Sequence, residues 1–426
     1  MSADDGPAVG CEKDRLQRDA ATLVAQLEEM GVELVAEVRE LGERMLEWRR
    51  RVHWTAETCF KEVRTAALVA EQLRGMEGVS EVRTGIACTG VTALVRGGLE
   101  GEGRVIMCRA DMDALPIPED TGLPFASTNG NSHACGHDGH TAMLLAAASV
   151  LGRRRSSLRG VVMLLFQPAE EGGGGAREML KEDLFPGDLA RISECYGIHL
   201  WNTEPLGTVS AAAGPNMAAS DRWTLDVRGR GGHGAAPHET VDPIVVAAHV
   251  VTALQTVVSR SVDPLDSAVV TVGTIHGGVA PNVIPGCCTL SGTARSLKPQ
   301  VQDLLVERMT RLSASVAEGF GATAVLNYIK SYPATVSTPA EARHVREAAS
   351  LVVGPGRVVS LPPIMGGEDF SFFLQRLPGC FFFVGSAASS DPRHMTPHHR
   401  ADFTLHEAAL FIGASIWVQL VASRLV

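Results

Sequence analysis

The sequence predicts an α/β domain with a mainly parallel sheet, interrupted by an inserted α+β domain. Short apolar runs alternate with helical segments, and GVVMLLFQ (160–167) is apolar on both faces, as strands of buried parallel sheets are. Between 217 and 332 the expected elements follow the order β-α-β-β-α-β, which is the ferredoxin-like arrangement. A chain of 426 residues also exceeds the usual size of one hydrophobic core.

The elements of the larger domain begin after an N-terminal extension. Residues 1–40 are expected to form this extension, which would be partly helical, with 1–20 disordered or loosely attached. The larger domain would then comprise 41–216 and 333–426. Hydrophobic periodicity and apolar runs predict, in order, helices within 21–50 and 61–75, strands within 90–97 and 103–116, a helix at 141–152, strands at 160–167 and 195–200, a helix at 340–353, a strand at 380–385 and a helix from about 406.

The inserted domain is expected over 217–332. Its predicted elements are a strand at 220–229, a helix at 243–260, strands at 268–275 and 287–295, a helix at 299–321 and a strand at 322–332. A glycine-rich loop, GRGGHGAAPH (229–238), follows the first of these strands.

Composition and charge exclude several classes of partner. The net charge is −10, which disfavours nucleic acid because phosphate binding needs a basic surface. No run reaches the about 18 unbroken apolar residues of a membrane span, and the N-terminus lacks the order of a secretory signal. The glycine runs at 172–175 and 229–234 do not bind nucleotides by a known pattern: neither is followed by Lys-Ser or Lys-Thr, and neither fits G-x-G-x-x-G after a strand. With nine scattered cysteines, we expect a cytoplasmic protein with reduced thiols and no membrane partner.

The stretch SHACGHDGH (132–140) concentrates groups that bind metals. Cys135 and His137 are two residues apart, so an extended segment would direct both side chains to one side. Thiolate and imidazole are good zinc ligands. His140, at the start of the next helix, would be a further ligand or a supporting residue. A polar loop with a capping histidine explains this stretch equally well on its own.

Three further segments carry candidate ligands or acids. Glu170 and Glu171 follow the apolar strand at 160–167, His199 lies in a strand, and His398 and His399 stand near the C-terminus. Each segment also has an ordinary explanation. The two glutamates would form a solvated turn, His199 would be a core histidine, and His398 and His399 would lie in an exposed loop. Because the first two segments and the Cys/His stretch lie at or just after strand ends, an α/β sheet would bring them together at one edge.

Seven motifs stand in the order found in the M20 metallopeptidase family: SHACGHDGH, PAEEGGGGA, GIHL, GRGGHGAAPH, PNVIPG, GGEDF and HHRADF. Over about residues 45–420 the chain resembles the amidohydrolase or aminoacylase branch, which includes hippurate hydrolases and indole-acetyl-amino-acid hydrolases. The resemblance implies a metal-dependent hydrolase that cleaves N-acyl amino acids or related small amide conjugates to a carboxylic acid and an amino acid. Alternatives are a dipeptidase-type peptidase of the same fold and a non-catalytic metal- or effector-binding relative.

The resemblance also implies a binuclear site, with two divalent ions per subunit. Zinc or manganese would be favoured, and cobalt or nickel would be alternatives. Glu170 would be the catalytic carboxylate, and Asp113 would orient a ligand. His399 is preferred over His398 because it precedes Phe403 by four residues, as the family's ligand precedes its aromatic residue. The implied metal ligands are Cys135 (bridging), His137, Glu171, His199 and His399.

Two residues of the inserted domain, His233 and Asn282, would contact substrate by the same resemblance. The inserted domain would act as a lid and dimerisation domain, and His233 can reach the other subunit's site in relatives. Alternatively, His233 would be an ordinary loop residue and Asn282 would only form a turn. The chain departs from the family at His53-Trp54-Thr55-Ala56-Glu57, where many relatives read H-x-H-P-E. Trp54 would enlarge the apolar contact at the substrate mouth or belong to the core.

Overall fold

The computed structural model describes residues 9–426 except 183, 186, 390 and 392–394. The chain divides into two compact units. Unit 1 comprises Met1–Gly214, Ser337–Leu361 and Phe372–Val426, and unit 2 comprises Pro215–Val336 and Pro362–Ser371. Relative to the expected insertion at 217–332, unit 2 therefore begins at Pro215, extends to Val336 and also includes the segment that carries GGEDF.

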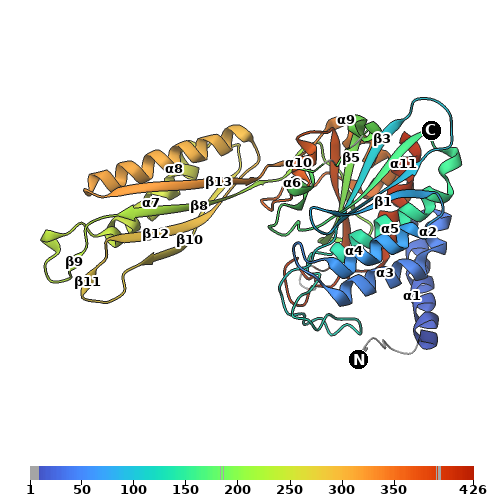
Figure 1. The fold of residues 1–426 in the computed structure, drawn as a ribbon, viewed down its shortest axis with the longest axis horizontal. Helices are drawn as coiled ribbons and strands as arrows, with labels where there is room; N and C mark the ends of the chain where they lie inside the picture. Colours follow the sequence, from blue (N-terminus) through green and yellow to red (C-terminus); the bar gives the residue numbers. More distant parts are fainter. Residues whose placement is uncertain (1–8, 183, 186, 390, 392–394) are drawn as a thin grey trace. The chain divides into compact units, whose positions relative to one another are not determined.

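Unit 1 is built around an eight-stranded sheet with a parallel centre (Figure 1). The four central strands pair in parallel, β4 with β3, β3 with β5, and β5 with β16. On one side β2 and β1 are antiparallel, and on the other side β6 is antiparallel to β16. The mainly parallel sheet is thus confirmed, with antiparallel additions at both sides. In spatial order the strands are β1 (Val79–Ile86), β2 (Gly90–Arg96), β4 (Gly160–Gln167), β3 (Arg104–Asp111), β5 (Ile192–Pro205), β16 (Gly379–Ala387), β6 (Val209–Ser210) and β15 (Val358–Val359).

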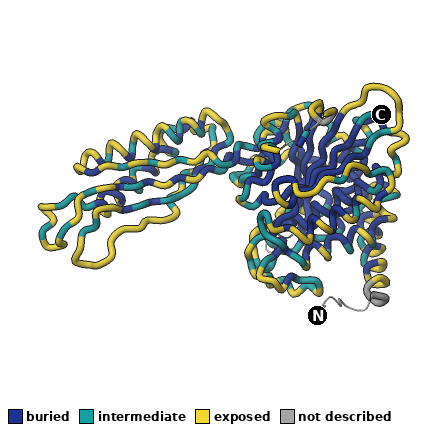
Figure 2. The backbone as a smooth tube through the Cα atoms, viewed as in Figure 1, coloured by how far each residue is buried: buried dark blue, intermediate teal, exposed yellow. Residues whose placement is uncertain are grey.

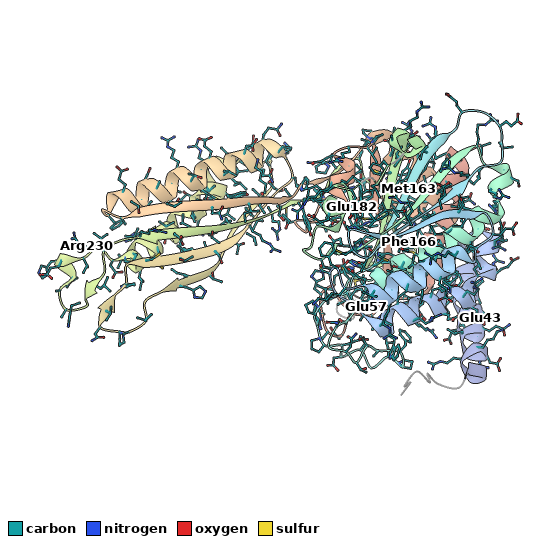
Figure 3. The ribbon with its side chains drawn as sticks, in the orientation of Figure 1. Glu43, Glu57, Met163, Phe166, Glu182 and Arg230 are labelled. Carbon is teal, nitrogen blue, oxygen red and sulfur yellow. The ribbon has the colours of Figure 1, made fainter. Side chains whose placement is uncertain are left out.

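Helices complete the core of unit 1. Met163 and Phe166 of β4 lie inside this core (Figure 3) and are fully buried. Helices α5 and α11 are buried along almost their whole length, which explains why their sequences are apolar on every face (Figure 2). The other helices of unit 1 are amphipathic or short. The helices are α1 (Val9–Glu29), α2 (Ala36–Glu40), α3 (Gly42–Thr55), α4 (Val63–Arg74), α5 (His137–Arg153), α6 (Gly175–Met179), α9 (Pro339–Val353), α10 (Ser371–Leu374), α11 (Ala408–Arg424) and the 3-10 turns η1 (Arg155–Ser157), η2 (Gly187–Arg191) and η4 (Pro355–Arg357).

The N-terminal segment differs from expectation. Helix α1 begins at Val9, and Leu16, Ala20, Val24 and Leu27 are buried in the main hydrophobic core. Their spacing of four and three residues places them on one helix face. The expectation of a loosely attached segment is therefore wrong from residue 13 onward, because this narrow apolar stripe is enough to dock an otherwise polar helix. Residues 1–8 lie outside the described part of the chain.

Unit 2 has the ferredoxin-like order that the sequence predicts. Its elements run β8 (Ala219–Arg228), α7 (Pro243–Ser261), β10 (Ala268–Gly277), β12 (Cys287–Ser296), α8 (Pro299–Gly319) and β13 (Thr323–Tyr332). The four strands form an antiparallel sheet in the order β10-β12-β8-β13. Two short strand pairs accompany this sheet: β9 (Gly232–His233) pairs with β11 (Val283–Ile284), and β7 (Gly214–Met217) pairs with β14 (Thr335–Ser337). The 3-10 turn η3 comprises Pro237–Glu239.

Helix α7 is the one helix in the described part of the chain that is long and apolar enough to cross a membrane by length and composition. In the structure it packs in unit 2, where Val246, Val250 and Val257 are buried with strand residues such as Leu225 and Leu290. Burial against the sheet accounts for these apolar residues, which recur on one helix face.

Candidate metal centre

The register of the central strands brings three segments to one edge of the sheet. Asp111, the last residue of β3, pairs with Gln167, the last residue of β4. Arg109 pairs with Gly197 of β5, so His199 lies level with Asp111. The chain that leaves β3 and β4 at this level carries Asp113, Glu170 and Glu171. Such an edge at the carboxyl ends of parallel strands is where α/β proteins bind ligands.

The structure brings all five predicted metal ligands together in two overlapping groups. Cys135, His137 and His199 form one group, and Cys135, Glu171 and His399 form the other, with the ligand atoms of each group within 4.8 Å of one another. Cys135 Sγ lies 3.4 Å from His199 Nε2, and His399 Nε2 lies 3.1 Å from Glu171 Oε1. Cys135 is common to both groups, which is the position that a bridging thiolate requires.

Hydrogen bonds to the backbone orient two of the histidines. His137 Nδ1 lies 2.8 Å from the Asp113 carbonyl oxygen and His199 Nδ1 lies 2.7 Å from that of Leu200. Each ring therefore donates from Nδ1, which leaves Nε2 as the nitrogen that a metal ion would bind. Among the described residues, His137 Nε2 is buried without a hydrogen-bond partner. A buried polar atom without a partner is costly, and a divalent cation would satisfy this one.

The two C-terminal histidines have different environments. His398 turns away, because its Nε2 donates to the Leu200 carbonyl at 3.0 Å and its ring packs on Trp201 with the centroids 4.6 Å apart. Burial lowers the pKa of His398 to about 4. His399 adopts a positive φ of 65°, and its interaction with Glu171 raises the pKa of the imidazole. The geometry thus places His399, rather than His398, with the other candidate ligands.

The electrostatics of the site favour a cation. Burial alone would lower the pKa of His137, but the carboxylates of Asp111 and Asp113 outweigh burial and raise this pKa to about 10. Burial, together with the charges of Glu171 and Glu170, raises the pKa of the Cys135 thiol. A thiolate at this position therefore needs a nearby positive charge. The donor set, the unpartnered Nε2 of His137 and the negative potential all fit divalent metal ions.

The local geometry of SHACGHDGH differs from the expected extended segment. Gly136 has a left-handed φ of 86°, and helix α5 begins at His137, so the chain turns sharply between the two ligands. His140 is a supporting residue, since Nδ1 lies 2.6 Å from Asp111 Oδ1 and Nε2 accepts the Leu200 N–H at 2.8 Å. Both of its ring nitrogens are therefore engaged.

Asp113 holds the turn that carries the two glutamates. Its Oδ1 accepts the N–H of Glu170 at 3.0 Å, and its Oδ2 accepts the N–H of Glu171 at 2.9 Å. Its carbonyl oxygen also accepts from His137. Glu170 itself is 6% exposed, and one of its oxygens lies within 4.8 Å of ligand atoms of His137 and Glu171. The predicted catalytic carboxylate thus lies beside the candidate metal ligands.

A buried charge network behind the site was not predicted from the sequence. Arg49 pairs with Asp138 at 2.9 Å and with Glu407 at 2.8 Å. His53 lies between Asp138 and Glu119, with nitrogen–oxygen distances of 2.8 and 3.0 Å. The position of Asp138 next to His137 was the available signal, but nothing in the local sequence identified its partners. The network fixes the first turn of α5.

The altered HWTAE segment leaves Trp54 at the surface. Trp54 is 49% exposed, and the Arg64 guanidinium lies 5.4 Å from its ring centroid. The core alternative for Trp54 is therefore wrong. Glu57, labelled in Figure 3, accepts the backbone N–H groups of Arg64 and Thr65 and so caps helix α4.

The predicted substrate-contact residues lie together within unit 2. His233 in β9 pairs with Val283 of β11, and the Gly234 N–H donates to the Asn282 carbonyl at 2.8 Å. Both His233 and Asn282 are exposed. Their contact with substrate stays a prediction.

Comparison with known proteins places these features in a family context. Residues 107–423 match the model of peptidase family M20/M25/M40. The chain is 40% identical to the putative amidohydrolase YhaA of Bacillus subtilis over 375 residues, which cover 88% of this chain and 93% of that protein. It is 39% identical to the N-acetyl-L-cysteine deacetylase of Bacillus subtilis, covering 90% of this chain and 89% of the deacetylase.

A solved structure shares the fold. The Bacillus subtilis YXEP protein, described as a dinuclear metal binding peptidase from the M20 family, aligns with a TM-score of 0.77 and 32% identity. The alignment covers 90% of this chain and 98% of that protein.

Proposed function

Because the chain belongs to peptidase family M20/M25/M40 and is therefore a hydrolase, we propose that it cleaves the amide bond of N-acyl amino acids or related small amide conjugates. The products are a carboxylic acid and an amino acid. The family predicted from the seven motifs is confirmed by the match over residues 107–423.

The observation that carries the proposal is a buried carboxylate beside a metal-ligand cluster. Glu170 is 6% exposed and adjoins ligand atoms of His137 and Glu171. The ligand cluster alone would serve a binding protein, whereas hydrolysis also needs a group that moves a proton. Glu170 provides this group beside one ligand of each group, His137 and Glu171.

In the proposed mechanism, Cys135, His137, Glu171, His199 and His399 hold two divalent ions, which when bound would polarise the amide carbonyl and acidify a water molecule. The Glu170 carboxylate accepts the proton of the attacking water and returns it to the leaving amine. Asp113 keeps Glu170 in place through the backbone N–H. His233 of the inserted domain donates to the developing oxyanion, and Asn282 contacts the substrate.

The proposal extends to the metals, the assembly and the compartment. Thiolate and imidazole ligands favour zinc, with manganese as the main alternative, and cobalt or nickel remain compatible. A cytoplasmic location fits the free cysteines among the residues whose side chains the structure describes. We propose a homodimer formed through unit 2, where exposed apolar side chains include Ile244, Val245, Val279 and Val283.

The test is release of free amino acid from a panel of N-acetyl and N-benzoyl amino acids and unblocked dipeptides. The protein is assayed with added zinc or manganese and again after chelation. We expect metal-dependent release from the acylated substrates and loss of turnover in Glu170→Gln with both metals retained. Release from dipeptides alone would favour a dipeptidase, and no release from any substrate would favour a metal-binding protein. Unchanged turnover of Glu170→Gln would refute the role of Glu170.

A further inference from the structure

The turn that carries Glu170 is held by carboxylates from two other segments. Three consecutive backbone N–H groups, those of Ala169, Glu170 and Glu171, each donate to a buried carboxylate. Asp113 accepts the second and the third. The first donates to Glu62 Oε1 at 2.9 Å, from a residue 107 positions away in the sequence. Ala169 adopts a positive φ of 55°, a conformation that is strained for an L-residue and therefore needs external support.

Glu62 is itself rigidly placed. It is fully buried at the N-cap position of α4. Its Oε1 also accepts the Phe60 N–H at 3.0 Å, and its Oε2 lies 2.5 Å from the Thr89 hydroxyl in the connection between β1 and β2. Both carboxylate oxygens are thus engaged, and the side chain links α4, the β1–β2 connection and the turn at Ala169. A side chain fixed at three points can hold a strained turn in one position.

We propose that Glu62 is a positioning residue, which sets the carboxylate of Glu170 by holding the N–H of Ala169. The inference rests on the proposed function of Glu170. Among the described residues, the hydrogen bonds of the Glu62 side chain go to Phe60, Thr89 and Ala169 and to none of the candidate metal ligands. Glu170 and Glu171 both keep their hydrogen bonds to Asp113, but Glu170 adjoins Ala169, whereas Glu171 is one residue further away. Loss of the Glu62 acceptor would leave the Ala169 N–H buried and unpaired, and relaxation of this residue moves its neighbour Glu170 first. The expected effect is therefore on turnover and not on metal content.

The experiment compares Glu62→Met with Glu62→Gln. Methionine fills a similar volume but offers no comparable acceptor, whereas glutamine keeps an oxygen for Ala169 and can donate to Thr89. A displacement of about 1 Å can cost on the order of 100-fold in rate. We expect kcat of Glu62→Met to fall about 100-fold with KM within about 2-fold and both metals retained, and kcat of Glu62→Gln to stay within about 3-fold of the wild type.

The matched control is Glu57→Met, since the Glu57 side chain also acts at the start of α4, where it accepts the N–H groups of Arg64 and Thr65, and it makes no hydrogen bond to the turn among the described residues. It should lower stability without lowering kcat. Amide hydrogen exchange of a peptide covering 168–172 gives a readout that does not depend on activity, and Glu62→Met should accelerate it. Unchanged exchange and kcat, loss of metal in Glu62→Met, or failure of glutamine to rescue would each overturn the proposal. If the wild type hydrolyses no amide, the proposed function fails, and the exchange measurement still decides whether Glu62 holds the turn.

Discussion

Asparagine in place of Asp113 tests how strongly the supporting carboxylate contributes to catalysis. In the wild type each carboxylate oxygen accepts one backbone N–H, from Glu170 at 3.0 Å and from Glu171 at 2.9 Å. Asparagine keeps one acceptor, and its amide group then faces the other N–H, so two donors oppose each other. A hydrogen bond to a charged group contributes about 1.5–3 kcal/mol. If this stabilisation is lost in the transition state, kcat falls by about 10- to 150-fold.

The assay is steady-state release of amino acid from an N-acetyl substrate at saturating metal. Saturation matters because loss of a residue that orients a ligand typically weakens metal affinity about 10- to 100-fold. Asp303→Asn, at the exposed end of an ion pair with Lys330, serves as the control and should keep full activity. If Asp113→Asn keeps wild-type kcat at saturating metal, the hydrogen bonds to the turn do not position Glu170.

Three further predictions concern stability. Arg49→Ala removes the arginine from the buried Asp138, which keeps His53, and from Glu407, which keeps Arg50. The free energy of unfolding in urea should therefore fall by about 3 kcal/mol, and a loss below about 1 kcal/mol would contradict the network. Burial raises the pKa of Glu62 to about 7 in the folded protein, above its value in the unfolded chain. Ionisation of Glu62 therefore destabilises the folded protein increasingly between pH 4.5 and pH 7, and the full loss of stability is reached above pH 7. Glu62→Gln should therefore be more stable than the wild type by about 3 kcal/mol at pH 8 and equally stable near pH 4.5. Equal stability of the two proteins at both pH values would exclude a raised pKa of Glu62. Leu16→Ala should lower the free energy of unfolding by about 2–5 kcal/mol, because Leu16 of α1 lies in the main hydrophobic core. An unchanged thermal denaturation temperature would show that α1 is not part of the core.

The sequence predicts the central strands of unit 1 and the order of unit 2 because burial imposes a clear pattern there. GVVMLLFQ is apolar throughout because β4 has neighbours on both sides and helices on its faces. Strand β1 was missed, since most of its side chains are exposed and it pairs through its backbone at the edge of the sheet. Helix α1 was misjudged because only a narrow stripe, which includes Leu16, is buried in an otherwise polar segment.

The candidate ligands were identifiable because a metal centre needs particular residue types in particular motifs. Their supports were harder to identify, since a buried carboxylate acts through partners far away in the sequence. Glu62 reaches Ala169 across 107 positions, and Arg49 reaches Asp138 across 89. No local pattern encodes such pairs. His140 illustrates the same limit, because only the structure shows that both of its nitrogens are already engaged.

Anomalous diffraction from crystals of the zinc- or manganese-loaded protein, recorded on both sides of the metal's absorption edge, tests the binuclear centre most directly. Two peaks about 3.5–4 Å apart are expected, with the Cys135 sulfur between them and His137, His199, Glu171 and His399 around them. A fully loaded protein with no anomalous peak at these side chains, or with peaks only elsewhere, would contradict the assignment of this cluster as the catalytic metal centre.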